Sequence, residues 1–426
     1  MKLLVVGGGG REHAIIKKLK ENKAVEVIYA LPGNAGIAAD ATCVNIGAKD
    51  IDGIVRFAVE KKIDYAVVAP DDPLVLGAVD SLNEVGIPCF GPKANAAIIE
   101  GSKIFSKNLM KKYGIPTAAY ETFEEADKAI AYLDAVDRYP TVIKADGLAL
   151  GKGVIIAQNR EEAVEAVHSM MEDKMFGASG SRVVIEEFLT GPEVSVLAFT
   201  DGKTVKPMVS SMDHKRALDN DEGLNTGGMG TVAPNPYYTE DVAALCMETI
   251  FLPTIHAMNA EGRTFKGCLY FGLMITQSGP KVIEYNCRFG DPETQVVLPL
   301  LKSDLLTVMQ ATTNGTLAET EVTFSDGAAC CVIVASKGYP QKYESGFPLA
   351  VPADTDREFS YVAGAKFDAQ GQMVSGGGRV VGVTAVHEDL SQAVSAAYEL
   401  VPQVKLENGF YRHDIGKRAL AAKKTR

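Results

Sequence analysis

The sequence has no uninterrupted apolar run of the ~18–20 residues that a membrane-spanning helix needs. It begins with a strand-like segment and has no basic, apolar and small-residue leader pattern, so we expect a cytoplasmic protein without a membrane partner. It also has no Cys-x-x-Cys motif, and only Cys330 and Cys331 are adjacent among its seven cysteines. This usage favours free, mostly buried thiols in a reducing compartment over a disulfide framework.

The chain also lacks the basic excess that general nucleic-acid binding requires. Its 43 lysines and arginines are outnumbered by 54 aspartates and glutamates, for a formal net charge of −11. The basic residues of 417–426 are the exception, and a solvated chain end is their simplest interpretation. With 46% hydrophobic and 23% charged residues over 426 positions, the composition is typical of a globular protein of about two to four domains.

Strand-like and helix-like segments alternate from the start, which predicts an open parallel α/β sheet over about residues 1–100. A second α/β unit is expected at 118–190, then a block with more antiparallel character, and a last domain from about residue 325. The expected helices are 11–21, 54–62, 73–85, 103–113, 126–133, 161–171, 241–258 and 390–400. The expected strands are 3–6, 25–29, 65–69, 87–90, 141–144, 154–157, 183–188, 194–199, 205–208, 268–275, 281–285 and 328–335.

The helix expected at 103–113 has clear end signals. Ser102 is a favourable N-cap, and Gly114 suits the left-handed position after the last turn. One face carries a stripe of like charges, which repel mildly at this spacing. These are Lys103, Lys107 and Lys111. Either this face is solvated or one of the lysines points at an anion.

The glycine-rich loop 7–10 lies between the first strand and the first helix, as in dinucleotide-binding folds. It does not fit the G-x-G-x-x-G pattern, because Glu12 or His13 stands where the third glycine belongs. The residues that follow the second strand, up to Asn34, do not include the acidic residue that would bind a ribose. Backbone N–H groups here could still bind a phosphate without NAD, which we favour over a purely structural turn.

A second glycine-rich segment, between Lys144 and Lys152, joins two expected strands. It is not a P-loop, because its glycines are too close together and Lys152 is followed by Gly153. A mobile flap with a lysine at each end could close over a triphosphate. The same pattern would equally suit a bare hairpin.

Two further segments carry groups that could bind a nucleotide or a small substrate. Glu186, Glu187 and Glu193 follow one strand and could accept hydrogen bonds from an adenine amino group and a ribose. The polar segment 213–230 could supply donors to a small substrate, or it could be disordered surface. A lone histidine is weak evidence of chemistry, so we assign His214 no role.

Residues 281–295 are the most informative part of the chain. Side chains two apart on a strand share a face, so Glu284, Asn286 and Arg288 would project together. Carboxylate and amide oxygens suit Mg²⁺, which often combines one or two protein ligands with nucleotide phosphates. Asp291 and Glu293 add two acids in the turn that follows. The alternative is a strand that leads into a charged surface turn.

Taken together, these motifs resemble the phosphoribosylamine–glycine ligases, or glycinamide ribonucleotide synthetases, which are ATP-grasp enzymes of de novo purine synthesis. The resemblance covers essentially the whole chain, and its most specific part is Arg-Phe-Gly-Asp-Pro-Glu at 288–293. Supporting motifs occur at 8–13, 32–36, 100–103, 144–147, 225–230 and 411–416.

The resemblance implies an α/β ATP-grasp fold in three parts. Residues 1–102 would form an N-terminal open parallel, Rossmann-like domain that binds the substrate phosphate. Residues 103–325 would form the ATP-grasp region, with a mobile nucleotide-binding lid at 118–190 and a catalytic and metal-binding part at 191–325. Residues 326–426 would form a small C-terminal α+β domain.

The implied reaction joins glycine to 5-phosphoribosylamine. Transfer of the ATP γ-phosphoryl group to glycine gives glycyl phosphate, and the amine then displaces phosphate to form glycinamide ribonucleotide. Such a transfer relies on positioning and charge neutralisation, so no covalent nucleophile is required. The implied partners are ATP, glycine, phosphoribosylamine and Mg²⁺ or Mn²⁺, with no nucleic acid or membrane, on a monomer with a dimer as the alternative.

The resemblance also implies the residues of the site. The metal ligands would be Glu284 and Asn286. The catalytic residues would be Arg288, Asp213 and Lys144. ATP would be bound by Lys103, Lys144, Lys152, Glu186, Glu187, Leu189 and Glu193. The other substrates would be bound by Gly9, Gly10, Asn34, Asp71, Asn225, Thr226, Gly228, Arg288, Gly378 and Arg379.

Two features depart from the family pattern, and other functions remain open. Asp71 stands where the family has glutamate, and segment 269–274 shows no third carboxylate ligand. The alternatives are an ATP-grasp relative that acts on another carboxylate and a non-catalytic nucleotide sensor. The intact pair of Glu284 and Asn286 disfavours a sensor, and the mismatches at Glu12 and Asn34 disfavour an oxidoreductase.

Overall fold

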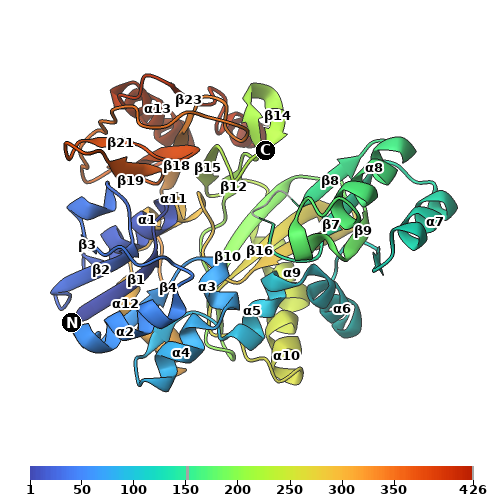
Figure 1. The fold of residues 1–426 in the computed structure, drawn as a ribbon, viewed down its shortest axis with the longest axis horizontal. Helices are drawn as coiled ribbons and strands as arrows, with labels where there is room; N and C mark the ends of the chain where they lie inside the picture. Colours follow the sequence, from blue (N-terminus) through green and yellow to red (C-terminus); the bar gives the residue numbers. More distant parts are fainter. Residues whose placement is uncertain (150–152, 425–426) are drawn as a thin grey trace.

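The computed structural model describes residues 1–149 and 153–424, and Figure 1 shows their arrangement. The N-terminal part is a parallel sheet, as the alternating pattern predicts. It has five strands in the order β3-β2-β1-β4-β5, and the short β3 was not predicted. Its strands are β1 (Lys2–Gly7), β2 (Val27–Pro32), β3 (Thr42–Cys43), β4 (Tyr65–Val68) and β5 (Cys89–Phe90). Its helices are α1 (Gly10–Leu19), α2 (Ile51–Lys61), α3 (Asp71–Val75), α4 (Ala78–Glu84) and α5 (Ala94–Gly101).

The prediction of a single helix at 73–85 is wrong, because two helices, α3 and α4, occupy that stretch. Gly77 has a φ of +88°, a left-handed conformation that ends α3 and begins α4. Helix α5 was not predicted. It is apolar with little amphipathic contrast, and it packs against α3 and α6 (Lys103–Tyr113) rather than on a solvated surface.

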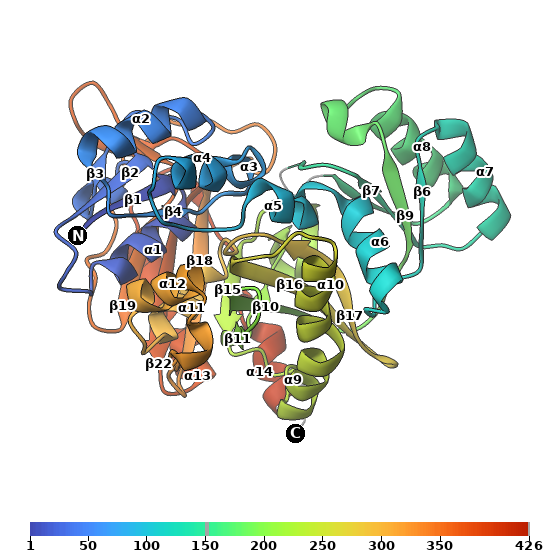
Figure 2. The same ribbon diagram turned by 90° about the horizontal axis from the view of Figure 1, so that it is seen from below.

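Residues 120–187 form a separate small α/β unit that projects to one side of the molecule (Figures 1 and 2). Its antiparallel sheet has the order β6-β9-β7-β8 and its own apolar core beneath two helices. The strands are β6 (Tyr120–Phe123), β7 (Thr141–Ala145), β8 (Val154–Ala157) and β9 (Val183–Glu187). The helices are α7 (Ala126–Val136) and α8 (Arg160–Met171).

The central part is an antiparallel sheet in the order β11-β10-β16-β17. Its strands are β10 (Glu193–Thr200), β11 (Val205–Pro207), β16 (Gly267–Thr276) and β17 (Gly279–Asn286). Within the described residues, one helical stretch, Glu240–Ala260, is long and apolar enough to cross a membrane by length and composition. Its buried Ile250, Phe251 and Ile255 belong to the core that the sheet also forms, which is the packing of a core helix.

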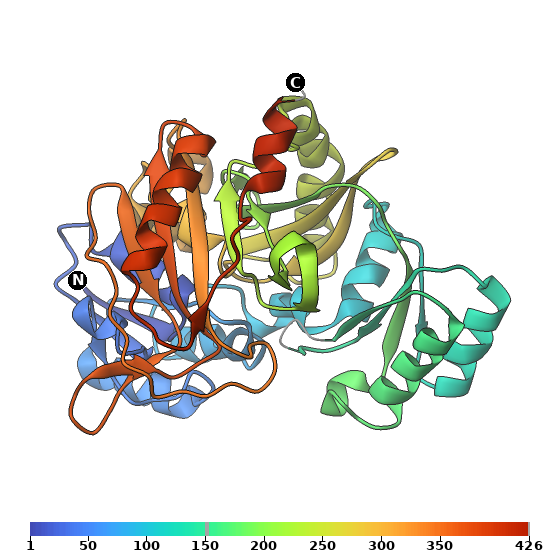
Figure 3. The same ribbon diagram turned by 90° about the horizontal axis from the view of Figure 1, so that it is seen from above.

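The last sheet joins the centre of the chain to its C-terminal part (Figure 3). Its order is β12-β15-β18-β22-β19, and β23 (Gly409–Phe410) also pairs with β18. Two of its strands, β12 (Met212–Asp213) and β15 (Gly230–Ala233), come from the polar segment 213–230 and its boundary. The others are β18 (Ala328–Ser336), β19 (Glu358–Val362) and β22 (Arg379–His387), covered by α13 (Leu390–Leu400).

Several short elements complete the chain. The segment between β12 and β15 contains the hairpin β13 (Arg216–Leu218) and β14 (Glu222–Asn225), so it is ordered structure. Helices α11 (Thr294–Val297) and α12 (Leu305–Asn314) pack in the core beside the N-terminal sheet. A second hairpin, β20 (Ala365–Phe367) and β21 (Met373–Ser375), precedes β22, and α14 (Lys417–Lys424) is the last helix. All seven cysteines are free and six are buried, as predicted.

Candidate active site

The ends of three strands meet at a small cavity of about 40 Å³. Glu284 reaches it from β17, Glu193 from the start of β10 and Asp213 from the end of β12. Lys215 and Tyr270 complete its polar wall. Three acids therefore face one ammonium group across a space that holds only a few water-sized groups.

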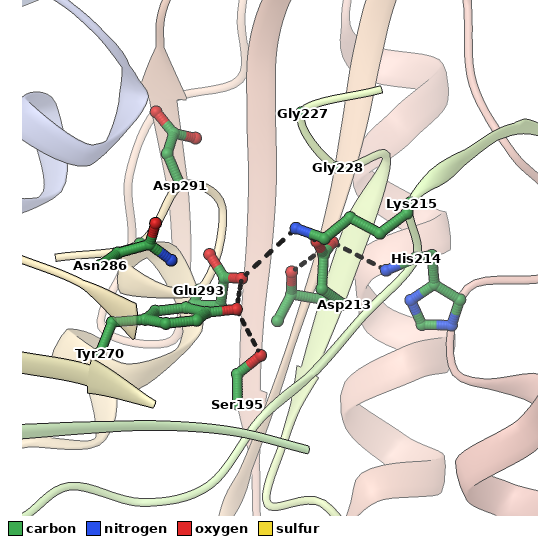
Figure 4. Close-up of polar contacts among 12 residues, drawn as sticks. Ser195, Asp213, His214, Lys215, Gly227, Gly228, Tyr270, Asn286, Asp291 and Glu293 are labelled. Carbon is green, nitrogen blue, oxygen red and sulfur yellow. Dashed lines mark hydrogen bonds and ion pairs between the residues drawn. The ribbon is translucent and has the colours of Figure 1, made fainter. Parts of the chain in front are cut away.

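A buried network links the two sides of this cavity (Figure 4). Lys215 Nζ lies 2.5 Å from Asp213 Oδ2 and 4.0 Å from Glu293 Oε1. The Tyr270 hydroxyl donates to Glu293 Oε1 at 3.1 Å and lies 2.8 Å from Ser195 Oγ. The side chain of Glu293 is only 2% exposed. The network fixes the position of Lys215, whose side chain stays 40% exposed.

The charges of this network support one another. Burial by itself would lower the pKa of Lys215, but Asp213, Tyr270 and Glu293 raise it well above its usual value. Burial raises the pKa of Glu293, and Lys215 opposes that rise. Sequence reasoning missed Lys215, Tyr270 and Ser195. Lys215 lies two residues after Asp213 in an extended segment, and this spacing was a signal that could have found it.

Glu284 and Asn286 lie near each other on β17, opposite Gly272 and Tyr270 of β16. Both are half-buried, while Tyr285 between them points into the core. A Cβ at Gly272 would lie 3.1 Å from Glu284 Cγ, so the glycine leaves room for the carboxylate. Two oxygen donors on one face of a strand fit a hard divalent cation. No cluster of three His, Cys, Asp or Glu side chains with metal-ligand geometry occurs in the described residues.

Arg288 lies just beyond β17, and its guanidinium returns toward the pair. Its Nη2 is 3.4 Å from Asn286 Oδ1 and 2.9 Å from Glu100 Oε1. Glu100 Oε2 also accepts the Cys287 N–H at 2.7 Å, so it fixes the turn that carries Arg288. Nε of Arg288 is buried and has no hydrogen-bond partner. The guanidinium therefore has a donor left for a bound group.

The predicted ATP-binding lysines lie between the projecting unit and the central sheet. Lys144 Nζ is 3.1 Å from Glu186 Oε2 and donates to the Ile283 carbonyl at 3.1 Å. Lys103 Nζ donates to the Gly147 carbonyl at 3.0 Å. Burial lowers the pKa of Lys103, while the nearby Glu284 carboxylate raises it. Lys152 lies outside the described residues.

The lysine stripe of α6 is not a solvated face throughout. Lys107 is buried, with Nζ 2.7 Å from Thr117 Oγ1 and 3.7 Å from Glu186 Oε1. Burial lowers the pKa of Lys107 to about 8, although Glu186 opposes the shift. Of the two alternatives, the structure shows a lysine that points at an anion, and this anion is a carboxylate of the chain itself.

The predicted adenosine residues lie from the end of β9 to the start of β10. The Glu186 carboxylate is occupied by Lys144 and Lys107, and its backbone carbonyl accepts the Thr141 hydroxyl at 3.1 Å. Glu187 Oε2 accepts the Ala119 N–H at 3.0 Å, and Leu189 lies between β9 and β10. The remaining residue, Glu193, lies at the mouth of the cavity described above.

The glycine loop before α1 shows why Glu12 stands in place of a third glycine. Glu12 Oε2 accepts the Gly9 N–H at 2.8 Å and so caps the helix from within. The Arg11 N–H donates to Asp291 Oδ2 at 3.2 Å. Two of the N–H groups that a phosphate could use already have acceptors in the chain. Gly10 lies against Gln295, because a Cβ there would be 2.7 Å from Nε2 of Gln295.

The other predicted substrate residues surround this loop. The Asn34 side chain is fully used, since it donates to the Gly8 and Val362 carbonyls and accepts from the N–H groups of residues 36 and 37. Asn34 therefore shapes the loop. Burial tends to raise the pKa of Asp71, but Arg288 and Arg11 lower it overall, so these two arginines lie close to it.

Loop 225–228 and the segment at Gly378 and Arg379 come together, although about 150 residues separate them in the chain. Arg379 Nη1 donates to the Asp291 carbonyl at 3.0 Å and to the Gly228 carbonyl at 3.4 Å. Tyr339 lies against Gly378, and its hydroxyl accepts the Gly227 N–H at 3.0 Å. Thr226 faces inward and Asn225 is exposed. The structure thus brings these predicted residues to one region.

Comparison with solved structures identifies the class of this fold. The biotin carboxylase domain of Hydrogenobacter thermophilus 2-oxoglutarate carboxylase, a structure that contains MgADP, has a TM-score of 0.76 at 16% identity. The match covers 99% of this chain and 93% of that one, and at this identity it shows the fold alone. The projecting unit and the central sheet, with the N-terminal parallel sheet, form an ATP-grasp fold.

The family is shown by the sequence comparisons. Models described as phosphoribosylglycinamide synthetase N domain, ATP-grasp (A) domain and C domain match residues 1–100, 101–294 and 329–418. The chain belongs to this family, and it is an ADP-forming carbon–nitrogen ligase that joins glycine to 5-phosphoribosylamine in purine biosynthesis. It uses ATP as a substrate together with a divalent metal.

Relatives match the chain over almost its whole length. A phosphoribosylamine–glycine ligase of Caldanaerobacter subterraneus is 47% identical over 97% of this chain and 99% of its own length. The ligase of Fusobacterium nucleatum is 45% identical over 98% of each. The crystal structure of the Thermotoga maritima phosphoribosylamine–glycine ligase superposes with a TM-score of 0.86 at 32% identity, covering 97% of this chain and all of that one.

Proposed function

We propose that Glu284 and Asn286 hold the divalent cation of this ligase, and that the cation is Mg²⁺ or Mn²⁺. The observation that carries this assignment is the pair of oxygen donors on one face of β17, beside Lys103 and Arg288. When bound, such an ion neutralises charge on the outer phosphates of a nucleotide. Gly272 supports the assignment because it leaves the Glu284 side chain unobstructed.

We assign the triphosphate to the side of the projecting unit that faces the central sheet. This unit, residues 118–190, would act as a lid over residues 191–325. Lys103 and Lys144 approach from the two sides of that junction, and Lys152 is proposed as a third phosphate contact from the family pattern. In the structure both described lysines donate to backbone carbonyls, at Gly147 and Ile283. For Lys103, exchanging this neutral partner for a phosphate oxygen gives a stronger, charge-assisted hydrogen bond, whereas Lys144 also pairs with the Glu186 carboxylate. Glu186, Glu187, Leu189 and Glu193 would surround the adenosine.

Glycine is assigned to the side of the cavity formed by Asp213 and loop 225–228. An acid suits the glycine ammonium group, and Arg288 suits an oxygen of the carboxylate or of the transferring phosphoryl group. The carboxylate attacks the γ-phosphorus, the bond to ADP breaks, and glycyl phosphate forms. Held rigidly, these donors need no reorganisation as charge develops. Lys144 would neutralise charge on the transferring group.

Phosphoribosylamine is assigned to the region where the N-terminal and C-terminal parts meet. Gly9, Gly10, Asn34 and Asp71 line one side, and Gly378 and Arg379 the other. The amine attacks the carbonyl carbon of glycyl phosphate, phosphate leaves, and the amine loses a proton. Arg11 and Arg379 flank Asp291 here, so positive charge is available for the 5′-phosphate. We also propose that the enzyme is cytoplasmic and acts as a monomer. Its domains would comprise residues 1–102, 103–325 and 326–426.

The metal assignment is tested with Glu284→Gln, which keeps the shape of the side chain and removes its charge. We expect glycine-dependent ADP formation to fall by roughly 100-fold or more, as for the loss of one transition-state clamp. Mn²⁺ affinity in the presence of ADP, measured by electron paramagnetic resonance, should fall in parallel. Glu60→Gln, at an exposed acid on α2, is the control. Unchanged Mn²⁺ affinity in the Glu284 variant would overturn the assignment.

A further inference from the structure

Arg412 is the largest side chain that is fully buried in the described structure, and it is only 1% exposed. It belongs to the motif at 411–416, for which the proposed function has no role. Nε and Nη2 donate to the two oxygens of Asp414, each at 2.8 Å. Nη1 donates to Asp221 Oδ1 and to the Arg216 carbonyl, both at 3.1 Å. One buried arginine thus joins the C-terminal segment to the hairpin β13–β14.

Further contacts tie the same two segments together. Asp219 accepts the His413 N–H at 2.7 Å, and Asp414 Oδ2 accepts the Asn220 N–H at 2.9 Å. The connection between β13 and β14 is therefore bonded at residues 219, 220 and 221 to the segment 412–414. The hairpin packs little against the rest of the protein, because its Leu218 and Leu224 are both about half exposed. Its position depends on the C-terminal segment.

His214 makes a second link between the C-terminal segment and the site. Its Nδ1 lies 3.0 Å from the Gly230 carbonyl, which can only accept, so Nδ1 carries the proton. Nε2 is then an acceptor and receives the Gly416 N–H at 3.2 Å. In Figure 4, His214 points away from the cavity while its neighbours Asp213 and Lys215 face it. The neutral ring connects the segment 213–215, which carries both charged groups, to residue 416.

The hairpin leads directly into the glycine side of the site. The Thr226 N–H and hydroxyl both donate to the Lys215 carbonyl, at 2.7 and 2.8 Å. Thr226 Oγ1 in turn accepts the Gly228 N–H at 3.0 Å. A Cβ at Gly228 would lie 2.7 Å from Asp213 Oδ1, so loop and carboxylate are in direct contact. Movement of the hairpin would displace Lys215, loop 225–228 and the space beside Asp213.

We propose that Arg412 is a positioning residue for the glycine side of the active site. It acts through Asp221 and the Arg216 carbonyl, which hold the hairpin and, through it, Thr226 and Lys215. Stability alone does not require this arrangement, because buried ion pairs can often be replaced by apolar groups without loss. A planar guanidinium that bonds four acceptors in fixed directions does fix geometry. The inference rests on the proposed assignment of loop 225–228 to glycine.

The test measures KM for glycine, ATP and phosphoribosylamine, together with kcat, in Arg412→Met. We expect KM for glycine to rise on the order of 10- to 100-fold, because a shift of about 1 Å in a positioning group costs that much. KM for ATP should stay within about twofold, because the lysines that are assigned to ATP lie on other elements. Arg412→Lys keeps the positive charge but lacks the forked guanidinium, so its KM for glycine should return only part of the way to the wild-type value. Arg357→Met, at an exposed arginine paired with Glu388, is the matched control.

Asp221→Asn removes the charge that pairs with Arg412 Nη1 at 3.1 Å and with Arg418 Nη1 at 3.5 Å, and it leaves the fork between Arg412 and Asp414 intact. We expect a smaller rise in KM for glycine in this variant, and it carries the test alone if Arg412→Met does not fold. Unchanged KM values in a folded Arg412→Met protein would overturn the inference, as would equal changes in all three KM values. Failure of the wild-type chain to use glycine would instead reject the proposed function.

Discussion

At the scale of single residues, the most informative side chain of the proposed ATP site is Glu186. It is buried between two ammonium groups, with Oε2 3.1 Å from Lys144 Nζ and Oε1 3.7 Å from Lys107 Nζ. A carboxylate shared by two lysines holds each of them less tightly than it would hold one. Lys107 therefore influences how readily Lys144 turns from Glu186 toward a phosphate.

Replacing Lys107 with Met should weaken ATP binding. Glu186 would be left with Lys144 as its only cation, so Lys144 would be held more strongly in the chain. We expect KM for ATP to rise roughly 10-fold, which corresponds to ~1.4 kcal/mol. Steady-state kinetics with varied ATP provides the measurement. Lys111→Met is the matched control from the same stripe, because Lys111 is exposed. Equal effects of both substitutions would contradict the interpretation.

The same side chain predicts a pH dependence. Because the pKa of Lys107 is about 8, it is charged below that pH and neutral above it. Raising the pH through 8 removes its charge and should act like the substitution. We expect kcat/KM for ATP in the wild type to fall as the pH rises from 7 to 9. This component of the profile should be missing in Lys107→Met, and a profile of the same shape in both proteins would refute the prediction.

Individual site residues were predictable from the sequence to different degrees. Glu284 and Asn286 follow from the two-residue period of a strand, and the structure places them on one face. Lys215 was missed although its two-residue spacing from Asp213 was a usable signal. Tyr270 was missed because its role depends on β16, a strand from another part of the chain. The period of a single strand does not reveal which residues face it from β16 or β12.

At the scale of elements, α6 shows how far local signals reach. The structure has this helix at Lys103–Tyr113, the range predicted from its caps. Ser102 Oγ accepts the Phe105 N–H at 3.1 Å, and Gly114 adopts a left-handed φ of +68°. Very short strands such as β3 and β12 gave no comparable signal, because their pairing partners alone define them. Helix α12 was also missed, although Asp304 caps its first turn and Gly315 follows it with a left-handed φ of +78°.

Gly114→Ala isolates the conformational role of the C-terminal glycine of α6. A Cβ at this position would meet nothing within 4 Å, so only the left-handed backbone opposes it. We expect a loss of about 1 kcal/mol in the free energy of unfolding. The midpoint of urea unfolding gives the measurement. Gly47→Ala is the control, since it has equal space and no positive φ, and it should be neutral or mildly stabilising.

At the scale of the whole molecule, His13 connects the first helix to the C-terminal part. Its Nδ1 accepts the Val362 N–H of β19 at 2.9 Å, so Nε2 carries the proton and donates to Asp40 Oδ2 at 2.8 Å. Burial lowers the pKa of His13 below its usual 6.5, although Asp40 opposes the shift. Lys17 adds to the lowering and Asp354 opposes it. The neutral ring is therefore part of the junction.

This junction should weaken in mild acid. The unfolded chain binds a proton at His13 below about pH 6.5, while the folded chain does so only at lower pH, so falling pH favours unfolding. We expect the stability advantage of wild type over His13→Gln to shrink between pH 7.5 and 5.5. Unfolding free energies of both proteins, measured across this range, provide the check. Parallel curves would contradict the prediction, and other titrating groups cancel in the difference.

Sheet topology at this scale could be predicted only in part. The alternation of strands and helices correctly indicates that β1, β2 and β4 are parallel. The sequence does not reveal that β15 crosses to pair with β18, because about 95 residues separate them and pairing at that distance has no local signal. The boundary between the central and C-terminal parts is therefore a shared sheet.

That shared sheet has a consequence for folding during synthesis on the ribosome. Asp213 belongs to an edge strand whose neighbour, β15, is completed only by β18 and then by β22. A nascent chain that has emerged as far as residue 300 already contains every acid proposed for the chemistry. It still lacks β18 and β22, the strands that complete the sheet to which Asp213 belongs. Ligase activity must therefore wait for the ribosome to deliver the final quarter of the polypeptide.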